Sequence, residues 1–157
     1  MASEEIYEYR ERITLHLNKG KLGYIQGDNR SILEIDTCPI FSQDKDLFYA
    51  LHQLFHEGTG RIQITKDYAG YLVYADLDTF IETEPLPPIK GLHVDYKNKS
   101  YKKGNFTLIS NVEGLKIEYT PQTFIQSNFI QSLNIYREII SRLEDSKTVL
   151  DLYSGIG

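Results

Sequence analysis

The sequence predicts an α+β fold with a largely antiparallel sheet and one or two helices, followed by the first helix and strand of a second domain. Eight short segments before residue 120 alternate apolar and polar residues, which is the period of a half-buried strand. One helical stripe of apolar residues lies among them. After residue 120 the pattern changes to a second helical stripe, a short apolar segment and a glycine-rich turn.

The first part of the chain is predicted to form a β-meander and then a helix. Alternation from Tyr7 to Leu17 indicates the first strand, and turns separate it from two further strands at 22–26 and 32–35. We expect Ser42 or Asp44 to cap the helix and Gly58 to end it. The apolar face of this helix comprises Leu47, Leu51, Leu54 and Phe55.

Five more strands complete the first domain. Segments 61–66 and 71–75 flank a turn of hairpin length, and the proline-rich stretch 84–88 is expected to be an extended connection. Lysines 97 to 103 are expected to lie in a loop. The last three strands are indicated by alternation in Leu92/Val94/Tyr96, Phe106/Leu108 and Leu115/Ile117/Tyr119.

The second domain is predicted to begin at residue 121, so that the two domains span 1–120 and 121–157. Ser127 or Asn128 is the expected N-cap of a helix. The helix carries its apolar stripe at Phe129, Leu133, Tyr136, Ile140 and Leu143. A strand at 148–153 follows. Because a parallel strand needs neighbours on both sides, we expect the chain to be a fragment cut just inside this domain.

Composition restricts the classes of protein. The 157 residues are 41% hydrophobic and 25% charged, with a net charge of −5. This is typical of a globular domain, and the acidic balance argues against a nonspecific polyanion binder. The single cysteine excludes an internal disulfide and a cysteine-rich zinc site within the chain. With neither a secretory signal nor a membrane-length apolar run in the sequence, we expect a cytoplasmic protein without membrane contact.

Two basic groups interrupt the acidic background. One accompanies the first strand, and the other interleaves with Tyr96, Tyr101 and Phe106; together they comprise Arg10, Arg12, Lys19, Lys21, Lys97, Lys99, Lys102 and Lys103. Lysines neutralise phosphates and aromatic rings stack on unpaired bases, which is how proteins hold single-stranded RNA. The alternative is a solvated hairpin tip whose tyrosines pack inward.

The end of the chain has the pattern D-x-x-x-G-x-G. Glycines after a buried strand let the backbone approach a ligand closely, although any tight turn between a strand and a helix can carry them. Upstream, residues 119–128 read YTPQTFIQSN, and the element F-x-Q-x-N precedes the helix. With residues 149–157, VLDLYSGIG, this arrangement resembles the RNA uracil-5 methyltransferase family, most closely the bacterial 23S rRNA members. The segments 9–12, 22–24 and 35–40 are also similar to that family's central domain, and the resemblance is loose from about 42 to 118.

The resemblance implies a Rossmann-like catalytic domain that uses S-adenosylmethionine to methylate C5 of a uridine, most specifically in 23S rRNA. It implies that Gln126 and Tyr153 contact this cofactor, with Asp151, Gly155 and Gly157 as the framework of the motif. It places Phe124 and Asn128 near the target base. The alternatives are a core or staple aromatic leading into the helix for Phe124 and plain helix capping for Asn128. In the family, the nucleophilic cysteine and the general base lie downstream of this motif, so we expect no catalytic residue and no activity in the isolated chain.

Cys38 precedes a proline, as does the fourth ligand of a 4Fe-4S cluster in many rRNA-modifying members of the family. Four thiolates hold such a cluster, so the resemblance implies a ligand role for Cys38 only in a longer parent protein. The alternative is a small buried residue at the end of a strand.

Several alternatives for function stay open. The chain can be an RNA-binding module without cofactor affinity, or part of a tRNA uracil-5 methyltransferase. A methyltransferase of small molecules would need only the terminal motif, and the F-x-Q-x-N element argues against it. We expect a parent protein that is a monomer, and a fragment that associates through its C-terminal helix and strand.

Overall fold

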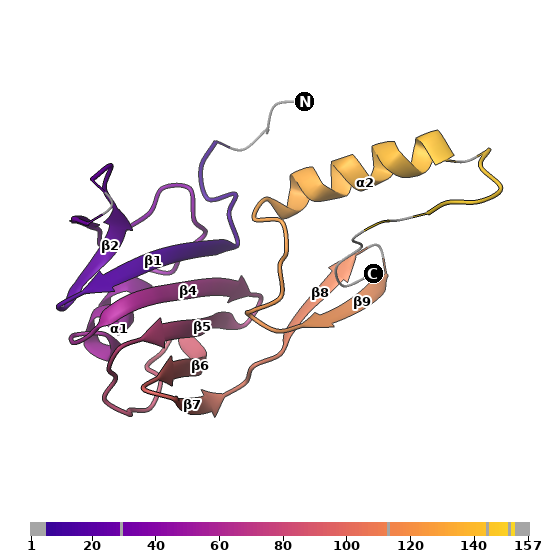
Figure 1. Cartoon of the computed structure of the whole chain (residues 1–157). Helices are drawn as coiled ribbons and strands as arrows, with labels where there is room; N and C mark the ends of the chain where they lie inside the picture. The colour runs from indigo at the N-terminus through magenta and orange to yellow at the C-terminus, as the bar shows by residue number, and fades with distance from the viewer. Residues whose placement is uncertain (1–5, 29, 113, 144, 151, 153–157) are drawn as a thin grey trace.

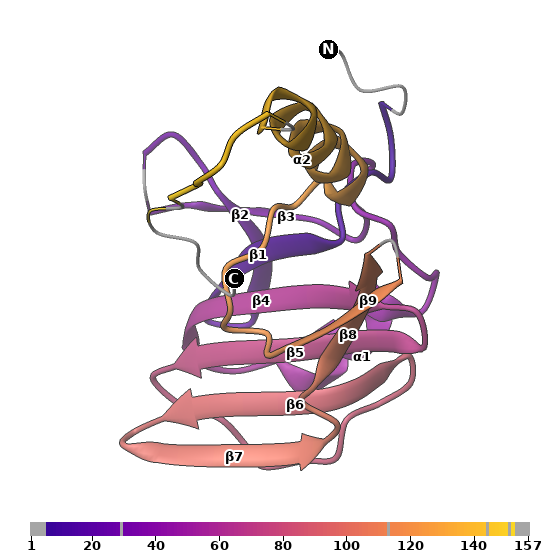
Figure 2. The same ribbon diagram turned by 90° about the vertical axis from the view of Figure 1, so that its right-hand side faces the viewer.

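A computed structural model of the chain describes residues 6–28, 30–112, 114–143, 145–150 and 152. Seven strands form one sheet in the order β3-β2-β1-β4-β5-β6-β7, and a two-stranded hairpin, β8–β9, lies beside it. The helix α1 and this hairpin lie on opposite faces of the sheet (Figures 1 and 2). The elements are β1 Arg12–Asn18, β2 Lys21–Ile25, β3 Ile32–Glu34, α1 Leu47–Leu54, β4 Thr59–Asp67, β5 Gly70–Leu77, β6 Ile89–Tyr96, β7 Lys99–Gly104, β8 Leu108–Val112, β9 Leu115–Tyr119 and α2 Phe129–Leu143.

The predicted α+β class with a largely antiparallel sheet is confirmed. Every neighbouring pair in the seven-stranded sheet is antiparallel except β5 and β6, which run parallel. The chain between these two strands must return to the other end of the sheet before β6 can start, and residues 78–88 make that crossing. The extended connection expected for 84–88 is part of this return.

The core lies between α1 and one face of the sheet. Five residues of α1 are buried there: Leu47, Phe48, Ala50, Leu51 and Leu54. They pack with the inward-facing residues of the strands, among them Ile13, Leu15, Ile62, Ile64, Val73, Ala75, Leu92 and Val94. Because side chains of a strand alternate between faces, the other residues of β1, β4, β5 and β6 form a second, more polar face.

The start of α1 differs from the prediction. Asp46 is the N-cap residue, and its side chain makes no capping hydrogen bond. The two residues expected to cap the helix have other roles: the backbone oxygen of Ser42 accepts from Tyr71 Oη (3.2 Å), and that of Asp44 accepts from the Leu47 amide (3.2 Å). Gly58 has φ of +90° in the turn into β4, after the helix has ended at Leu54.

The loop expected at 97–103 is wrong, because most of it is a strand. Lys97 and Asn98 have positive φ (45° and 61°) and form a two-residue turn, after which β7 pairs with β6. β7 carries lysines that point to both faces, so it has no apolar alternation. This is the composition of an exposed edge strand, which charged side chains protect from pairing with another chain.

The C-terminal region projects from the sheet (Figure 1). α2 covers the predicted stripe and is capped by Asn128, whose Oδ1 accepts from the Gln131 amide (3.0 Å). Residues 148–150 and 152 form no strand, contrary to the prediction, and residues 151 and 153 lie outside the described part. A strand needs a hydrogen-bonding partner, and the described residues offer none beside this segment. No helix in the described part is long and apolar enough to cross a membrane.

Candidate functional site

The segment between β9 and α2 crosses the polar face of the sheet and carries the F-x-Q-x-N element. Its first half is tied to the sheet by three side chains. Arg12 Nη1 donates to the Thr123 carbonyl (2.6 Å), Gln63 donates to the Pro121 carbonyl, and Gln122 Nε2 donates to His93 Nδ1 (2.9 Å). Its second half is held by the Glu11 amide, which donates to the Ser127 carbonyl (3.2 Å).

Arg12 is buried, with 9% of its surface exposed, although it lies on the face of β1 opposite the apolar residues Ile13, Leu15 and Leu17. Its Nε donates to Thr65 Oγ1 (3.1 Å), and its Nη2 has no hydrogen-bond partner. Burial lowers the pKa of the guanidinium, and Tyr119 partly opposes this effect. The prediction missed the burial because the segment that covers Arg12 is more than 100 residues away in the sequence. Arg12 therefore holds the segment in place.

Phe124 and Gln126 point away from the protein. Phe124 is 78% exposed, so the alternative of a core aromatic is wrong. Gln126 is also exposed, and its side-chain carboxamide has no hydrogen-bond partner among the described residues. An aromatic ring and a free carboxamide are thus presented together from a segment that is anchored on both sides.

Asn128 and Arg10 lie where this segment meets α2. The capping alternative for Asn128 is confirmed by its bond to the Gln131 amide, and an isolated β-bridge joins Asn128 to Arg10. The Arg10 amide donates to the Ile40 carbonyl (2.8 Å), while its Nε is buried without a partner. Arg10 therefore connects α2, the first strand and the stretch around residue 40.

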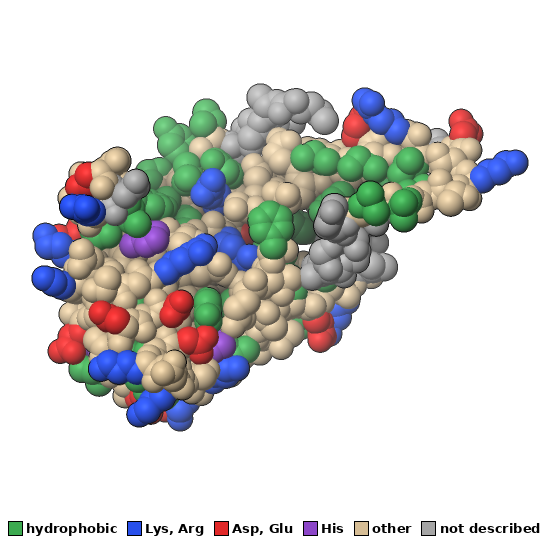
Figure 3. Space-filling view, viewed as in Figure 1, with side chains coloured by type: hydrophobic (Ala, Val, Ile, Leu, Met, Phe, Trp, Pro, Cys, Tyr) green, Lys and Arg blue, Asp and Glu red, His purple; other side chains and the backbone are tan. Residues whose placement is uncertain are grey.

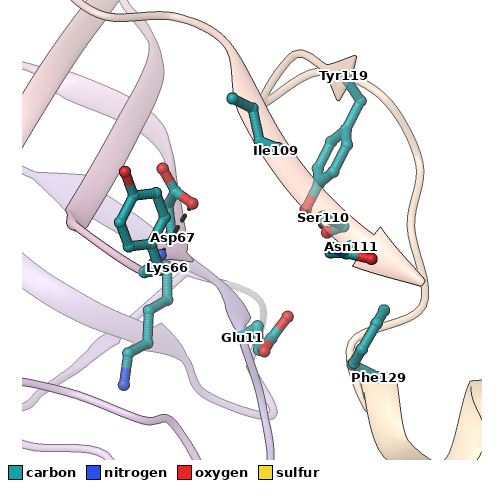
Figure 4. A pocket seen from close by; sticks show the side chains of 9 residues that line it. Glu11, Lys66, Asp67, Ile109, Ser110, Asn111, Tyr119 and Phe129 are labelled. Atoms are coloured by element: carbon teal, nitrogen blue, oxygen red, sulfur yellow. Dashed lines mark hydrogen bonds between the residues drawn. The ribbon is translucent and has the colours of Figure 1, made fainter. Parts of the chain in front are cut away.

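A small cavity lies next to this junction (Figure 4). It is lined by Lys66 and Asp67 of β4, by Ser110, Asn111 and Tyr119 of the hairpin, by Glu11 just before β1 and by Phe129 at the start of α2. Burial raises the pKa of the Glu11 carboxyl, and the charge of Lys66 opposes this. The cavity has a volume of about 230 Å³, below the several hundred Å³ of typical ligand pockets. It therefore does not fit a cofactor of nucleoside size.

The lysine-rich edge, which comprises Lys97, Lys99, Lys102 and Lys103, contains both free and ion-paired lysines. Lys97, Lys99 and Lys102 are exposed, and Lys103 forms an ion pair with Glu84 (2.8 Å). The tyrosines between them pack inward, which confirms the alternative for these rings. Tyr96 is 9% exposed and donates to Glu82, and Tyr101 donates to the Thr83 carbonyl (2.9 Å).

Cys38 is buried, with 4% of its surface exposed. Its Sγ lies 3.2 Å from Tyr24 Oη, and its amide donates to Gln43 Oε1 (3.1 Å). In the described ranges, no group of three or more His, Cys, Asp or Glu residues is arranged to hold a metal ion. The four residues expected in the terminal motif lie outside the described residues: Asp151, Tyr153, Gly155 and Gly157.

Sequence reasoning missed Gln63, Gln122 and His93, which hold the segment to the sheet. Their side chains meet only because β4, β6 and the segment after β9 are brought together by the fold. The one available signal was the alternation of β4 and β6, which places Gln63 and His93 on the polar face.

Comparison with known proteins gives a consistent result, although no protein-family model matches the chain. The chain is 33% identical to the "Uncharacterized RNA methyltransferase pc0248" of Protochlamydia amoebophila, over 96% of the chain and 40% of that protein. It is 25% identical to the tRNA (uracil(54)-C(5))-methyltransferase of Pyrococcus abyssi, over 99% of the chain and 45% of that protein. It is 26% identical to the 23S rRNA (uracil(1939)-C(5))-methyltransferase RlmD of Aliivibrio fischeri, over 100% of the chain and 41% of that protein.

The fold agrees with these relatives. The crystal structure of the Pyrococcus abyssi tRNA (uracil-54, C5)-methyltransferase in complex with S-adenosyl-L-homocysteine superposes with a TM-score of 0.75 at 18% identity, covering 98% of this chain and 45% of that one. The chain spans less than half the length of the curated relatives it matches. These relatives confirm the resemblance to RNA uracil-C5 methyltransferases.

Proposed function

We propose that this chain is part of an S-adenosylmethionine-dependent RNA methyltransferase that methylates C5 of a uridine. A loop of 23S rRNA is the first substrate to test, and tRNA is the second because a tRNA enzyme is similar in both sequence and fold. The observation that carries the proposal is the anchored segment with Phe124 and Gln126 exposed, in a chain whose relatives are RNA methyltransferases.

The anchored segment is suited to hold an unpaired base. A ring as exposed as that of Phe124 offers a stacking surface to any base, whereas a core aromatic does not. Arg12 is a positioning residue in this proposal, since its guanidinium fixes the Thr123 carbonyl next to the ring. Asn128 fixes the other side by capping α2, and its side-chain amide nitrogen is proposed as a further base contact.

S-adenosylmethionine supplies the methyl group when it is bound. Gln126 fits a role in holding it, because an exposed carboxamide without a partner can both donate and accept hydrogen bonds. The resemblance assigns the remaining contacts to Tyr153, Asp151, Gly155 and Gly157. Cys38 is buried against Tyr24 and is therefore no nucleophile in this chain. One cysteine does not fit a 4Fe-4S cluster, which takes four thiolates.

The lysine-rich edge is the proposed contact for the RNA backbone. Lys97, Lys99 and Lys102 have no ion-pair partner among the described residues, so they can neutralise phosphates without breaking an existing bond. Lys103 would first have to leave Glu84. We expect the change of all three free lysines to alanine to weaken RNA binding more at low salt than at moderate salt.

The test is RNA binding followed by fluorescence anisotropy, with a labelled hairpin that carries uridines in its loop. Stacking on Phe124 predicts that Phe124→Ala weakens binding by about 5- to 150-fold. Tyr49→Ala is the matched control, because Tyr49 is 67% exposed on α1, behind the sheet. Equal losses in the two variants would contradict the proposed role of the segment. A 23S rRNA hairpin and a tRNA T-arm as alternative probes decide between the two substrates.

A further inference from the structure

One row of polar residues runs across five strands of the sheet. In the strand register, His16 of β1 is opposite Arg61 of β4, which is opposite Asp76 of β5; the row continues to Asp95 of β6 and Ser100 of β7. Residues paired in this way lie on one face, here the face opposite α1. Four steps of roughly 4.8 Å make the row about 19 Å long.

This row is open, whereas the two rows that lie between it and the β8–β9 hairpin on the same face are covered. The row through Leu72 packs under Leu108 and Tyr119 of the hairpin. The row through His93 is bonded to Gln122 and contacts the Phe106 ring. The open row instead borders two hollows, one of about 600 Å³ and one of about 490 Å³, and Asp76 lines both.

The walls of the first hollow carry opposite charges. Arg61 and Arg30, which comes from the turn between β2 and β3, lie on the basic side with His16. Burial lowers the pKa of His16, and the charge of Arg61 lowers it further. Figure 3 shows basic side chains gathered over β1 and β4 on this face, with acidic ones over β5 and β6.

Arg30, Arg61 and Asp76 are free to bind a ligand. All three are exposed, and none has an ion-pair partner within 4 Å among the described residues. Asp95 differs, because Tyr74 donates to its Oδ2 (2.9 Å) and His93 lies 3.0 Å from its Oδ1. Asp76 is therefore the available acceptor in the row.

We propose that the open row is a ribonucleotide-binding site in which Arg61 and Arg30 hold a phosphate and Asp76 accepts a hydrogen bond from the adjoining ribose 2′-hydroxyl. This inference rests on the proposed function, since it assumes an RNA ligand. Arg61 and Asp76 are directly opposite each other, with Cβ atoms about 5 Å apart. In RNA the 2′-hydroxyl and the 3′-phosphate sit on neighbouring carbons of one ribose, so adjacent acceptor and cation match a single nucleotide.

The row also distinguishes RNA from DNA. A deoxyribose brings no donor to Asp76 and leaves its carboxylate beside a phosphate of the same charge. Beyond Asp76, the second hollow is lined by Lys97 and Lys99, which extend the basic surface for the next phosphate. The open row therefore forms a continuous surface from the lysine-rich edge to Arg61 and Arg30. Neither arginine was among the RNA-binding residues predicted from the sequence.

The experiment compares the binding of a short oligouridylate and an oligodeoxyuridylate of equal length to the whole chain, by anisotropy at low and moderate salt. The unaltered chain should prefer the RNA by about 5- to 20-fold, and Asp76→Ala should abolish this preference. Asp76→Asn keeps one acceptor oxygen and should retain part of it. Arg61→Ala should weaken both ligands about tenfold and reduce the salt dependence by about one counterion.

Charge-matched controls are Asp145→Ala, just after α2, and Arg142→Ala, in its last turn; both residues are exposed, and Arg142 is paired with Glu138 (2.7 Å). If Asp76→Ala leaves the ratio of RNA to DNA affinity unchanged while Phe124→Ala still weakens RNA binding, the row is not the ribonucleotide site and the proposed function stands. If Arg61→Ala binds as tightly as Arg142→Ala, the phosphate assignment is overturned. A chain that binds no RNA at low salt would overturn both proposals.

Discussion

The two helices have similar amphipathic sequences and different environments. α1 buries five of its eight residues against the sheet, whereas the only buried residue of α2 is Ser132. Apolar side chains of α2 are exposed instead, at Ile130, Ile135, Tyr136, Ile139 and Ile140. Helical periodicity therefore identifies an apolar face and leaves open what that face contacts.

The largest expected contrast is between one residue of the apolar stripe in each helix. Leu51→Ala removes a side chain that is fully buried, and we expect it to lower the free energy of unfolding by about 2–5 kcal/mol. Ile140→Ala, at 61% exposure, should change it by less than about 0.5 kcal/mol. Urea unfolding at low protein concentration measures both. A large loss for Ile140→Ala would mean that α2 is packed against another surface, such as the second copy expected from the sequence.

A glycine substitution tests how closely the C-terminal part packs on the sheet. A Cβ at Gly91 would lie 1.8 Å from the Asn105 carbonyl oxygen, so Gly91→Ala must displace the chain that leads into β8. We expect a loss of about 1–3 kcal/mol in urea unfolding. Gly27→Ala is the matched control, because nothing lies within 4 Å of its added Cβ. Equal stability of the two variants would show that this packing is loose.

Removing the N-cap side chain should destabilise α2 by about 1 kcal/mol more than α1. Asn128→Ala removes the side-chain bond to the Gln131 amide, which costs about 1 kcal/mol of helix stability. Since α2 makes few buried contacts, the loss should appear as lower helical circular dichroism and faster amide exchange in α2. Asp46→Ala is the counterpart in α1 and should have a smaller effect, because Asp46 makes no side-chain capping bond. The reverse order would contradict the capping geometry.

The core around α1 should also weaken at alkaline pH. Burial raises the pKa of Tyr71 to about 12, against about 10 in an unfolded chain. The unfolded chain therefore releases this proton first, and stability falls as pH rises from about 10 to about 12. Urea midpoints at several pH values measure the slope, which should be shallower in Tyr71→Phe and unchanged in Tyr49→Phe. An unchanged slope in Tyr71→Phe would assign the effect to other tyrosines.

The sequence was most informative where side chains alternate against a core. β1 and β4 show apolar residues at every second position. β4 was predicted within two residues of its ends, whereas β1 begins at Arg12, five residues after the predicted start at Tyr7. β7 was missed because an edge strand needs no apolar face and carries lysines instead. The caps of α1 were misplaced because Ser42 and Asp44 use their backbone groups for bonds to Tyr71 and Leu47.

The residues of the candidate site also fall into those that the sequence predicted and those that it did not. Phe124, Gln126 and Asn128 were identified from one local element, and the structure holds that element on the sheet. The burial of Arg12 and the alignment of Arg61 with Asp76 could not be read from local sequence. Both depend on the register between strands and on which segment crosses the polar face, and these are properties of pairs distant in sequence.

The amino-acid sequence alone therefore determined the α+β class, the two amphipathic helices and the resemblance to RNA uracil-C5 methyltransferases, since these follow from local periodicity and contiguous motifs. The tertiary structure decided which cations are free and which are buried: Arg12 is enclosed beneath the segment at Thr123, whereas Arg61 is exposed in the open row. The physical reason is that burial and hydrogen bonding are set by neighbours across strands, and those neighbours are chosen only when the sheet assembles.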